Sequence, residues 1–131
     1  MVVDTSALAA IILGEENAEA LLSALLHTDE VVRVSVATLV EATMVVEARH
    51  GPDAAGDLDL LLAKVDAEIT SVDPDQGRLA VAAWRRFGKG RHPAALNLGD
   101  CFSYALARSA GETLLFKGRD FAQTDIGSAL R

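Results

Sequence analysis

The amino-acid sequence predicts a three-layer α/β/α sandwich with a short parallel sheet at its centre. Short, largely apolar segments alternate along the chain with longer segments in which leucine and alanine recur at helical spacing. Strands that are apolar throughout are typical of a parallel sheet with both faces buried. Helices must then cover the sheet on both sides, which gives the three layers.

The first half of the chain contributes two strands and four helices to this prediction. The strands are predicted at 1–3 and 31–34, and the helices at 7–13, 16–27, 35–50 and 53–65. Polar residues 4–6 separate the first strand from the first helix. The β-branched valines of 31–34 favour a strand, Ser35 suits a helix N-cap, and Gly51 with Pro52 predicts a helix end.

The second half contributes two strands and two helices. The strands are predicted at 69–72 and 113–116, and the helices at 74–87 and 98–110. Asp73 and Pro74 end the third strand, and proline suits the first turn of the helix that follows. A glycine-spaced loop at 88–93 separates the last two helices, and Gly111 ends the final one.

Length and composition indicate a single folded domain spanning residues 1–131. Half of the residues are hydrophobic and 24% are charged, which excludes a disordered tail. The only cysteine, Cys101, cannot form an internal disulfide, which fits a reducing compartment. The first basic residue is Arg33, and the sequence shows neither a signal-peptide pattern nor a membrane-length apolar segment. We therefore expect a cytoplasmic protein that does not contact membranes.

Four acidic residues occupy positions that simple solubility does not explain. Asp4 follows the first predicted strand and Asp120 follows the last, at the sheet edge where parallel α/β folds bind ligands, although each could instead cap a helix or turn. Glu41 has apolar neighbours within its helix, so it should be paired or metal-bound unless its carboxylate reaches water. Asp100 lies in a first helical turn, where the helix dipole favours an anion, but apolar residues flank it.

These four carboxylates would repel one another if the fold brought them together. At about 5 Å and an effective dielectric constant near 20, each pair costs about 3 kcal/mol. Convergence therefore requires bound protons, water or divalent cations. Oxygen ligands favour hard ions such as Mg²⁺ or Mn²⁺, and the three histidines lack the paired spacing of a zinc site.

Several segments of the sequence resemble PIN-domain ribonucleases, and most closely the VapC toxins of prokaryotic toxin–antitoxin pairs. They are residues 3–7, the helix around Glu41, and residues 96–102 and 114–121, which occur in the family's order and spacing over nearly the whole chain. The resemblance implies a Mg²⁺- or Mn²⁺-dependent endoribonuclease that hydrolyses RNA phosphodiester bonds. Its catalytic and metal-binding residues would be Asp4, Glu41, Asp100 and Asp120, and Thr5 or Ser6 would support them by hydrogen bonding.

The resemblance also implies partners, and the sequence departs from the family at one position. A homodimer is expected, together with a cognate antitoxin protein whose tail occupies the acidic groove. Arg119 stands where many relatives have an acid or amide. A cation here reduces the local negative charge and puts the number of tightly bound metals in doubt. It could instead hold a phosphate or a site carboxylate.

The basic residues are concentrated in one stretch. The chain has 12 Lys and Arg against 19 Asp and Glu, a net charge of −7 that repels nucleic acid unless it is unevenly placed. Between Asp75 and Asp100 there are five cations and no acid. We expect Arg85, Arg86, Lys89 and Arg91 to bind RNA phosphates along a track leading to Asp100. The alternative is an ordinary solvated helix face followed by a flexible loop.

Three other functions remain open from the sequence. A receiver-like phosphoacceptor switch could use an acidic pocket and Lys117, but Asp53, the mid-chain candidate acceptor, follows a Gly-Pro helix end rather than a strand. A phosphatase with a nucleophilic Asp4 is disfavoured because Ser6 stands where that chemistry needs a second aspartate. A PIN fold that binds RNA without cleaving it is the third.

Overall fold

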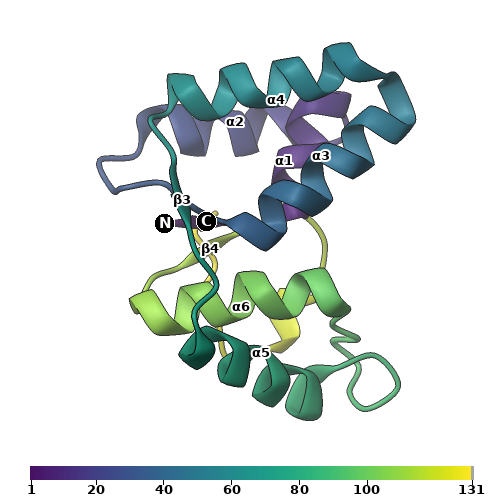
Figure 1. Cartoon of the computed structure of the whole chain (residues 1–131), viewed down its shortest axis with the longest axis vertical. Coiled ribbons are helices and arrows are strands. Elements are labelled where there is room, and N and C mark those ends of the chain that lie inside the picture. Colours follow the sequence, from purple (N-terminus) through teal and green to yellow (C-terminus); the bar gives the residue numbers. More distant parts are fainter. Residues whose placement is uncertain (131) are drawn as a thin grey trace.

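A four-stranded parallel sheet in the order β3-β2-β1-β4 forms the middle layer of the protein (Figure 1). The structure is a computed structural model that describes residues 1–130. Its strands are β1 (Val2–Val3), β2 (Arg33–Ser35), β3 (Glu68–Thr70) and β4 (Leu114–Leu115). Its helices are α1 (Thr5–Leu13), α2 (Ala18–His27), α3 (Val36–His50), α4 (Pro52–Lys64), α5 (Pro74–Phe87) and α6 (Leu98–Ala110), followed by a short 3₁₀ turn at Phe121–Gln123.

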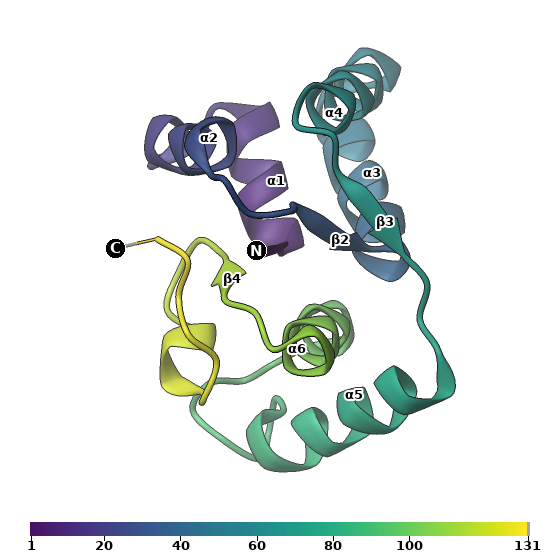
Figure 2. The same ribbon diagram turned by 90° about the vertical axis from the view of Figure 1, so that its left-hand side faces the viewer.

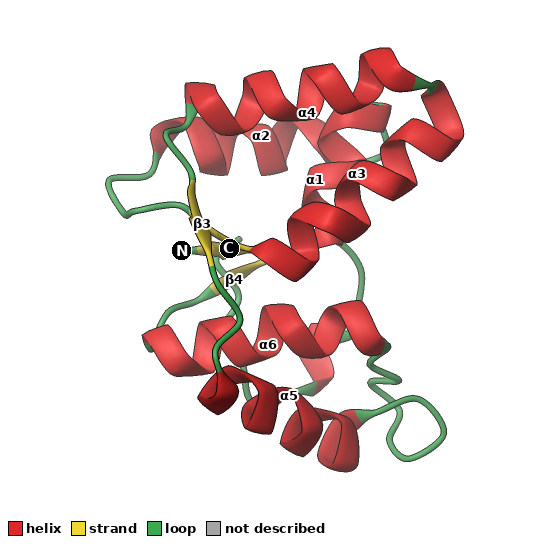
Figure 3. Ribbon diagram, in the orientation of Figure 1, coloured by secondary structure: helices red, strands yellow, loops and turns green. Residues whose placement is uncertain are grey.

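The helices cover the sheet in two layers. Figure 2 shows α1 to α4 on one side of the strands and α5 with α6 on the other. Figure 3, coloured by secondary structure, shows the same short strands between the two helical layers. The predicted three-layer α/β/α architecture is confirmed. None of the helices in residues 1–130 is long and apolar enough to cross a membrane.

Strands β1 and β4 each contribute to two separate hydrophobic cores. Val2 and Leu114 pack with α5 and α6, whereas Val3 and Leu115 pack with the helices of the opposite layer. Successive side chains of a strand point to opposite faces of the sheet, so both residues of a two-residue strand are buried. This is the physical reason why β1 and β4 are apolar without alternation.

Several predicted boundaries are wrong by a few residues, for local reasons. The first helix starts at Thr5 because Asp4 caps it, accepting a hydrogen bond from the Ser6 backbone N–H. The second helix starts at Ala18, after Asn17, which has a left-handed backbone with φ of 70°. Pro52 is the first residue of α4, a position that proline suits, so the gap between α3 and α4 is only Gly51.

The strand predictions need similar corrections. β2 covers 33–35, not 31–34, and β3 covers 68–70, not 69–72. The C-terminal segment was not predicted to join the sheet. It pairs with β4 nonetheless, because the Leu114 N–H donates to the Gly127 carbonyl and the Ala129 N–H donates to the Leu114 carbonyl, each at 2.9 Å.

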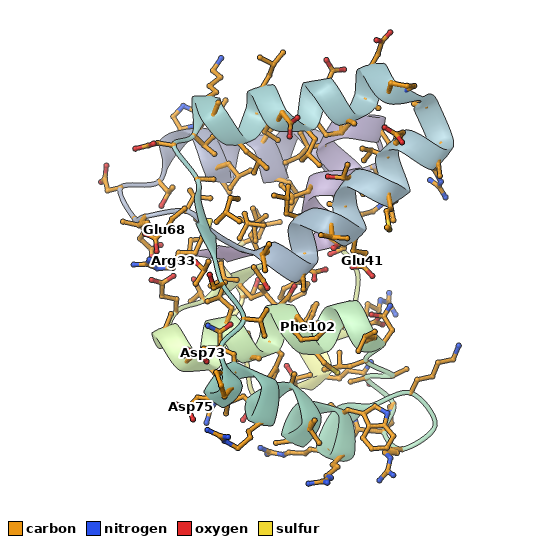
Figure 4. All side chains as sticks on the ribbon, in the orientation of Figure 1. Arg33, Glu41, Glu68, Asp73, Asp75 and Phe102 are labelled. Carbon is orange, nitrogen blue, oxygen red and sulfur yellow. The ribbon has the colours of Figure 1, made fainter. Side chains whose placement is uncertain are left out.

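A network of charges connects β2 to its neighbours. Arg33 donates to Glu112 at 2.9 Å and to Glu68 at 2.7 Å, and Figure 4 shows Arg33 beside Glu68. Partial burial works against the ionised form of Glu112. Hydrogen bonds from the Met1 amino group and from Arg33 outweigh it and hold the pKa of Glu112 below its ordinary value.

Glu112→Gln is expected to lower the free energy of unfolding by about 1 kcal/mol at pH 7, since partly exposed ion pairs are screened by water. Because the folded-state pKa is lowered, the contribution of Glu112 is present above the ordinary carboxyl pKa and is lost as the pH falls through the folded value. Urea unfolding at pH 7 and pH 3 measures both effects, with the exposed Glu19→Gln as control. An equal loss at both pH values would contradict the explanation.

Candidate active site

A cleft of about 340 Å³ opens at the carboxyl edge of the sheet and brings the four predicted acids together. Asp4 comes from the end of β1, Glu41 from α3, Asp100 from the first turn of α6, and Asp120 from the segment after β4. The cleft is also lined by Thr5, Ser6, Ala9, Leu13, Glu15, Val45, Arg49 and Asn97. Four carboxylates that are far apart in the sequence thus share one small space.

Asp4 is the most enclosed of the four acids, with only 1% of its surface exposed. One carboxylate oxygen, Oδ2, accepts from the Ser6 backbone N–H at 3.0 Å, and the other, Oδ1, accepts from the Ser103 hydroxyl at 2.6 Å. Asp4 therefore caps α1, as one of its two interpretations predicts. The cap does not prevent a second role, because each carboxylate oxygen has a further lone pair.

Ser103 donates a hydrogen bond to Asp4, and Thr38 contacts Ser103 in turn. The sequence analysis identified neither residue. Their hydroxyl oxygens are 3.1 Å apart, and both residues are buried. Since Ser103 gives its proton to a carboxylate that can only accept, Thr38 must donate to Ser103. Helical spacing could have revealed both residues. Thr38 lies three residues before Glu41, and Ser103 lies three residues after Asp100. Each hydroxyl residue therefore shares a helix face with one of the acids.

Thr5 and Ser6 behave differently from the expected support of the carboxylates. Ser6 supports Asp4 through its backbone N–H, whereas its hydroxyl accepts from the Lys117 N–H at 3.0 Å. The Thr5 hydroxyl is buried and has no hydrogen-bond partner among residues 1–130, although Thr5 lines the cleft. A buried, unpaired hydroxyl on a residue that lines the cleft is available to a bound water or to a ligand oxygen.

Asp100 carries the clearest electrostatic signature of the cleft. Burial raises its pKa to about 7; a hydrogen bond from the Asn97 N–H opposes this, and the charges of Asp4, Asp120 and Glu41 add to the rise. Asp100 and Asn97 form a capping box, in which each side chain accepts from the other's backbone N–H, at 3.0 and 2.9 Å. The Asp100 carboxylate is therefore held firmly but ionises reluctantly without a cation.

Glu41 and Asp120 are the other two acids that line the cleft. Figure 4 shows Glu41 on α3, on the side that faces α6. Its carboxylate lies directly against Gly99 of α6. Asp120 is exposed, and its side chain does not cap the 3₁₀ turn that follows it. The side-chain cap considered for Asp120 is therefore not formed, but Asp120 does lie in a turn, where its backbone carbonyl accepts from the Gln123 N–H at 3.2 Å.

The basic residues closest to the cleft are not those that the sequence analysis singled out. Arg49 lines the cleft and donates to Glu15 at 3.3 Å, and Lys117 donates to the other oxygen of Glu15 at the same distance. Arg119 is exposed, is not among the residues lining the cleft, and forms no ion pair within residues 1–130. The Arg119 side chain thus does not hold a site carboxylate in the described part of the chain.

The predicted basic stretch lies outside the acidic cleft. Arg86 pairs with Asp125 at 3.1 Å, and the Arg91 guanidinium lies 4.1 Å from the ring centre of Trp84. Lys89 lines an apolar groove between α5 and α6, and this groove shares Asn97 with the acidic cleft. None of Arg85, Arg86, Lys89 and Arg91 is among the described residues that line the acidic cleft.

The donor set fits a hard divalent cation bound partly through water. Within residues 1–130, no three His, Cys, Asp or Glu side chains are arranged to hold a metal ion as they stand. The cleft nevertheless offers oxygen donors and an unpaired Thr5 hydroxyl. Mg²⁺ keeps several of its waters and commonly uses only one or two carboxylates directly. Such an ion would also counter the burial and the neighbouring negative charges that raise the pKa of Asp100.

A parallel α/β/α sandwich with an oxygen-lined acidic cleft at its sheet edge has the architecture of a metal-dependent hydrolase domain. Comparisons with known proteins define the family. The profile of the PIN domain matches residues 1–127. The chain is 48% identical to a ribonuclease VapC of Mycolicibacterium smegmatis and 46% identical to ribonuclease VapC30 of Mycobacterium tuberculosis, covering 98% of this chain and 97–98% of each relative. The chain belongs to the PIN domain family and, within it, to the VapC ribonucleases.

The fold is shared with a solved structure. Mycobacterium tuberculosis VapC20, described as a Sarcin-Ricin loop cleaving toxin, aligns with a TM-score of 0.79 over 95% of both chains at 21% identity. The family predicted from the sequence is confirmed. The PIN-domain match and the VapC relatives together rule out the receiver-like and phosphatase alternatives.

Proposed function

We propose that this chain, a single PIN-like domain over residues 1–131, is a metal-dependent endoribonuclease and the toxin of a VapBC-type toxin–antitoxin pair. The observation that carries the proposal is the convergence of Asp4, Glu41, Asp100 and Asp120 in one oxygen-lined cleft. The VapC relatives named above support the same activity. Mg²⁺ or Mn²⁺ suits the cleft because every candidate ligand is an oxygen.

The four carboxylates would hold the ion and orient the RNA phosphate. A bound divalent cation supplies an acidified water and neutralises charge on the phosphate and the leaving oxygen. Ser103 and the Ser6 N–H fix Asp4, and the capping box fixes Asp100. Asp120 lies at the exposed mouth. A bound cation would favour the ionised form of Asp100, against the burial and the neighbouring negative charges that raise its pKa.

Arg85, Arg86, Lys89 and Arg91 are proposed to guide RNA toward this cleft. Lys89 supports the proposal best, because its groove and the acidic cleft share Asn97. The stretch carries five positive charges while the rest of the chain carries a net −12. Phosphates would therefore approach along the end of α5 and the loop that precedes α6.

Reversing Arg85 and Arg86 to Glu is expected to weaken RNA binding at least tenfold and to lower the slope of log affinity against log salt by about 1.4 for single-stranded RNA. Binding is measured with Asp100→Asn as background, so that RNA stays intact. Arg78→Glu with Lys64→Glu changes the net charge equally at sites farther from the cleft and should have a smaller effect. Equal losses of RNA affinity in the two double variants would show that Arg85 and Arg86 are ordinary surface residues.

A protein partner and a second copy are proposed to use the apolar surface beside the cleft. Val40 and Met44 of α3 and Leu98 of α6 are each more than half exposed, and they line a groove of about 460 Å³ that also contains Glu41. Exposed apolar side chains of this size mark interaction surfaces. We propose a homodimer and an antitoxin whose tail reaches the acidic cleft, in a cytoplasmic protein.

The test is cleavage of total RNA by the purified chain, free of antitoxin, with Mg²⁺, with Mn²⁺ and with EDTA. Discrete fragments that require metal and disappear in Asp100→Asn would support the ribonuclease. RNA binding without cleavage under either metal would favour the non-cleaving PIN fold instead.

A further inference from the structure

We propose that Gly99 is a positioning residue for Glu41: the missing side chain at this position provides the space in which the Glu41 carboxylate lies. The inference rests on the proposed function, because it concerns the same site. The Glu41 carboxylate comes from the middle of α3, and Gly99 is the second residue of α6. The two residues are 58 positions apart in the sequence, so only the fold brings them into contact.

The contact leaves no room for a side chain at position 99 while the Glu41 carboxylate keeps its position. A β-carbon placed on Gly99 would overlap both carboxylate oxygens of Glu41. Those oxygens form the end of a flexible side chain, so the carboxylate, and not the backbone, would have to move. Figure 4 shows Glu41 on the α3 side that faces α6, with Phe102 one turn further along α6. A side chain at position 99 would therefore displace only the Glu41 carboxylate.

The beginning of α6 is a favourable place for this carboxylate. The capping box satisfies the N–H groups of Asn97 and Asp100, while those of Leu98 and Gly99 have no intrahelical acceptor. The positive end of the helix dipole also points this way and stabilises a nearby anion. Glycine lets the carboxylate approach this end closely, which partly offsets the repulsion from Asp100.

Backbone conformation does not explain the glycine. Gly99 is helical and its φ lies outside the left-handed region, in contrast to Gly14 and Gly111, which end helices with φ of 64° and 66°. A glycine inside a helix destabilises it relative to alanine, because glycine loses more backbone freedom on folding. Gly56 and Gly77 are also helical, but a β-carbon on either would meet nothing within 4 Å. Only at Gly99 does the helix bring a glycine against a site carboxylate.

Gly99→Ala is therefore expected to displace the Glu41 carboxylate while leaving the protein folded. A misplacement of about 1 Å in an active site can cost about 100-fold in rate. We expect a loss of about that size in RNA cleavage and weaker Mn²⁺ binding. The melting temperature in EDTA should be unchanged or higher.

The experiment compares the wild-type chain, Gly99→Ala, Glu41→Ala and the double variant, with Gly56→Ala as the matched control. Mn²⁺ binding is measured by electron paramagnetic resonance and cleavage on one RNA. Gly99→Ala should weaken both in the wild-type background and change neither by more than about twofold in the Glu41→Ala background, since it acts through Glu41. Gly56→Ala should change neither.

Two results would overturn the inference alone. One is wild-type Mn²⁺ binding and cleavage in Gly99→Ala, and the other is an equal loss with and without the Glu41 side chain. A wild-type chain that neither binds Mn²⁺ nor cleaves RNA would overturn the proposed function, and the inference with it.

Discussion

Asp100→Asn is expected to reduce metal-dependent RNA cleavage about 1000-fold while leaving the protein folded. Asparagine keeps the shape of the side chain and can still accept the hydrogen bond from the Asn97 N–H, so the capping box survives. It cannot supply the negative charge that a divalent cation requires. Cleavage of a defined RNA with Mn²⁺ measures the effect. Asp75→Asn, in the first turn of α5, is the control and should be fully active.

The same variant should stabilise the metal-free protein at high pH. The pKa of Asp100 is about 7 in the fold, against an ordinary value of 3.8. The fold therefore binds this proton more tightly than the unfolded chain, and Asp100 costs stability as the pH rises from about 4 to about 7. Solvent screening reduces the cost to about 1 kcal/mol. In EDTA, Asp100→Asn should melt at a higher temperature than the wild-type chain at pH 8, and the two melting temperatures should be equal near pH 4. Marked unfolding of the variant would show that Asp100 is only a helix cap.

Ser103→Ala is expected to lower both the stability and the activity of the protein. The change leaves one oxygen of the buried Asp4 carboxylate without its 2.6 Å hydrogen bond and leaves the Thr38 hydroxyl without its acceptor. Buried groups left unpaired cost about 1–3 kcal/mol each. Loss of an outer-shell hydrogen bond to a metal ligand typically costs 10–100-fold in metal affinity or activity.

Urea unfolding and Mn²⁺ titration of Ser103→Ala measure the two effects separately. Ser109→Ala is the matched control, because Ser109 is an exposed serine on the same helix. Ser103→Thr restores the hydroxyl and tests whether the donor alone is sufficient. Wild-type metal affinity in Ser103→Ala would contradict a role in holding Asp4.

The sequence predicts the fold, and the convergence of the four acids in one cleft, because both follow from local rules. Val2 and Val3 are apolar since each faces a different core, and that absence of alternation indicates a parallel sheet. Asp4 and Asp120 are found because parallel strands end at one edge. Gly99 could not be found this way, because its role depends on how α3 packs against α6.

The basic stretch shows why sequence proximity alone is a weak guide to a surface. Arg85 and Arg86 are adjacent, but neighbouring helical residues point about 100° apart, and Arg86 finds Asp125 as its partner. The pairing of the C-terminal segment with β4 was missed for a related reason. The C-terminal segment joins β4 through backbone hydrogen bonds, which no side-chain pattern records.

The two-residue strands make the two helical layers thermodynamically dependent on each other. Val2 belongs to one core and Val3 to the other, and Leu114 and Leu115 divide in the same way. A single peptide bond thus joins the cores at β1, immediately before Asp4. Neither layer can open without pulling a buried valine or leucine out of the other. The protein should therefore unfold as one cooperative unit, and the edge of the sheet that carries the acidic cleft should have no local unfolding step of its own.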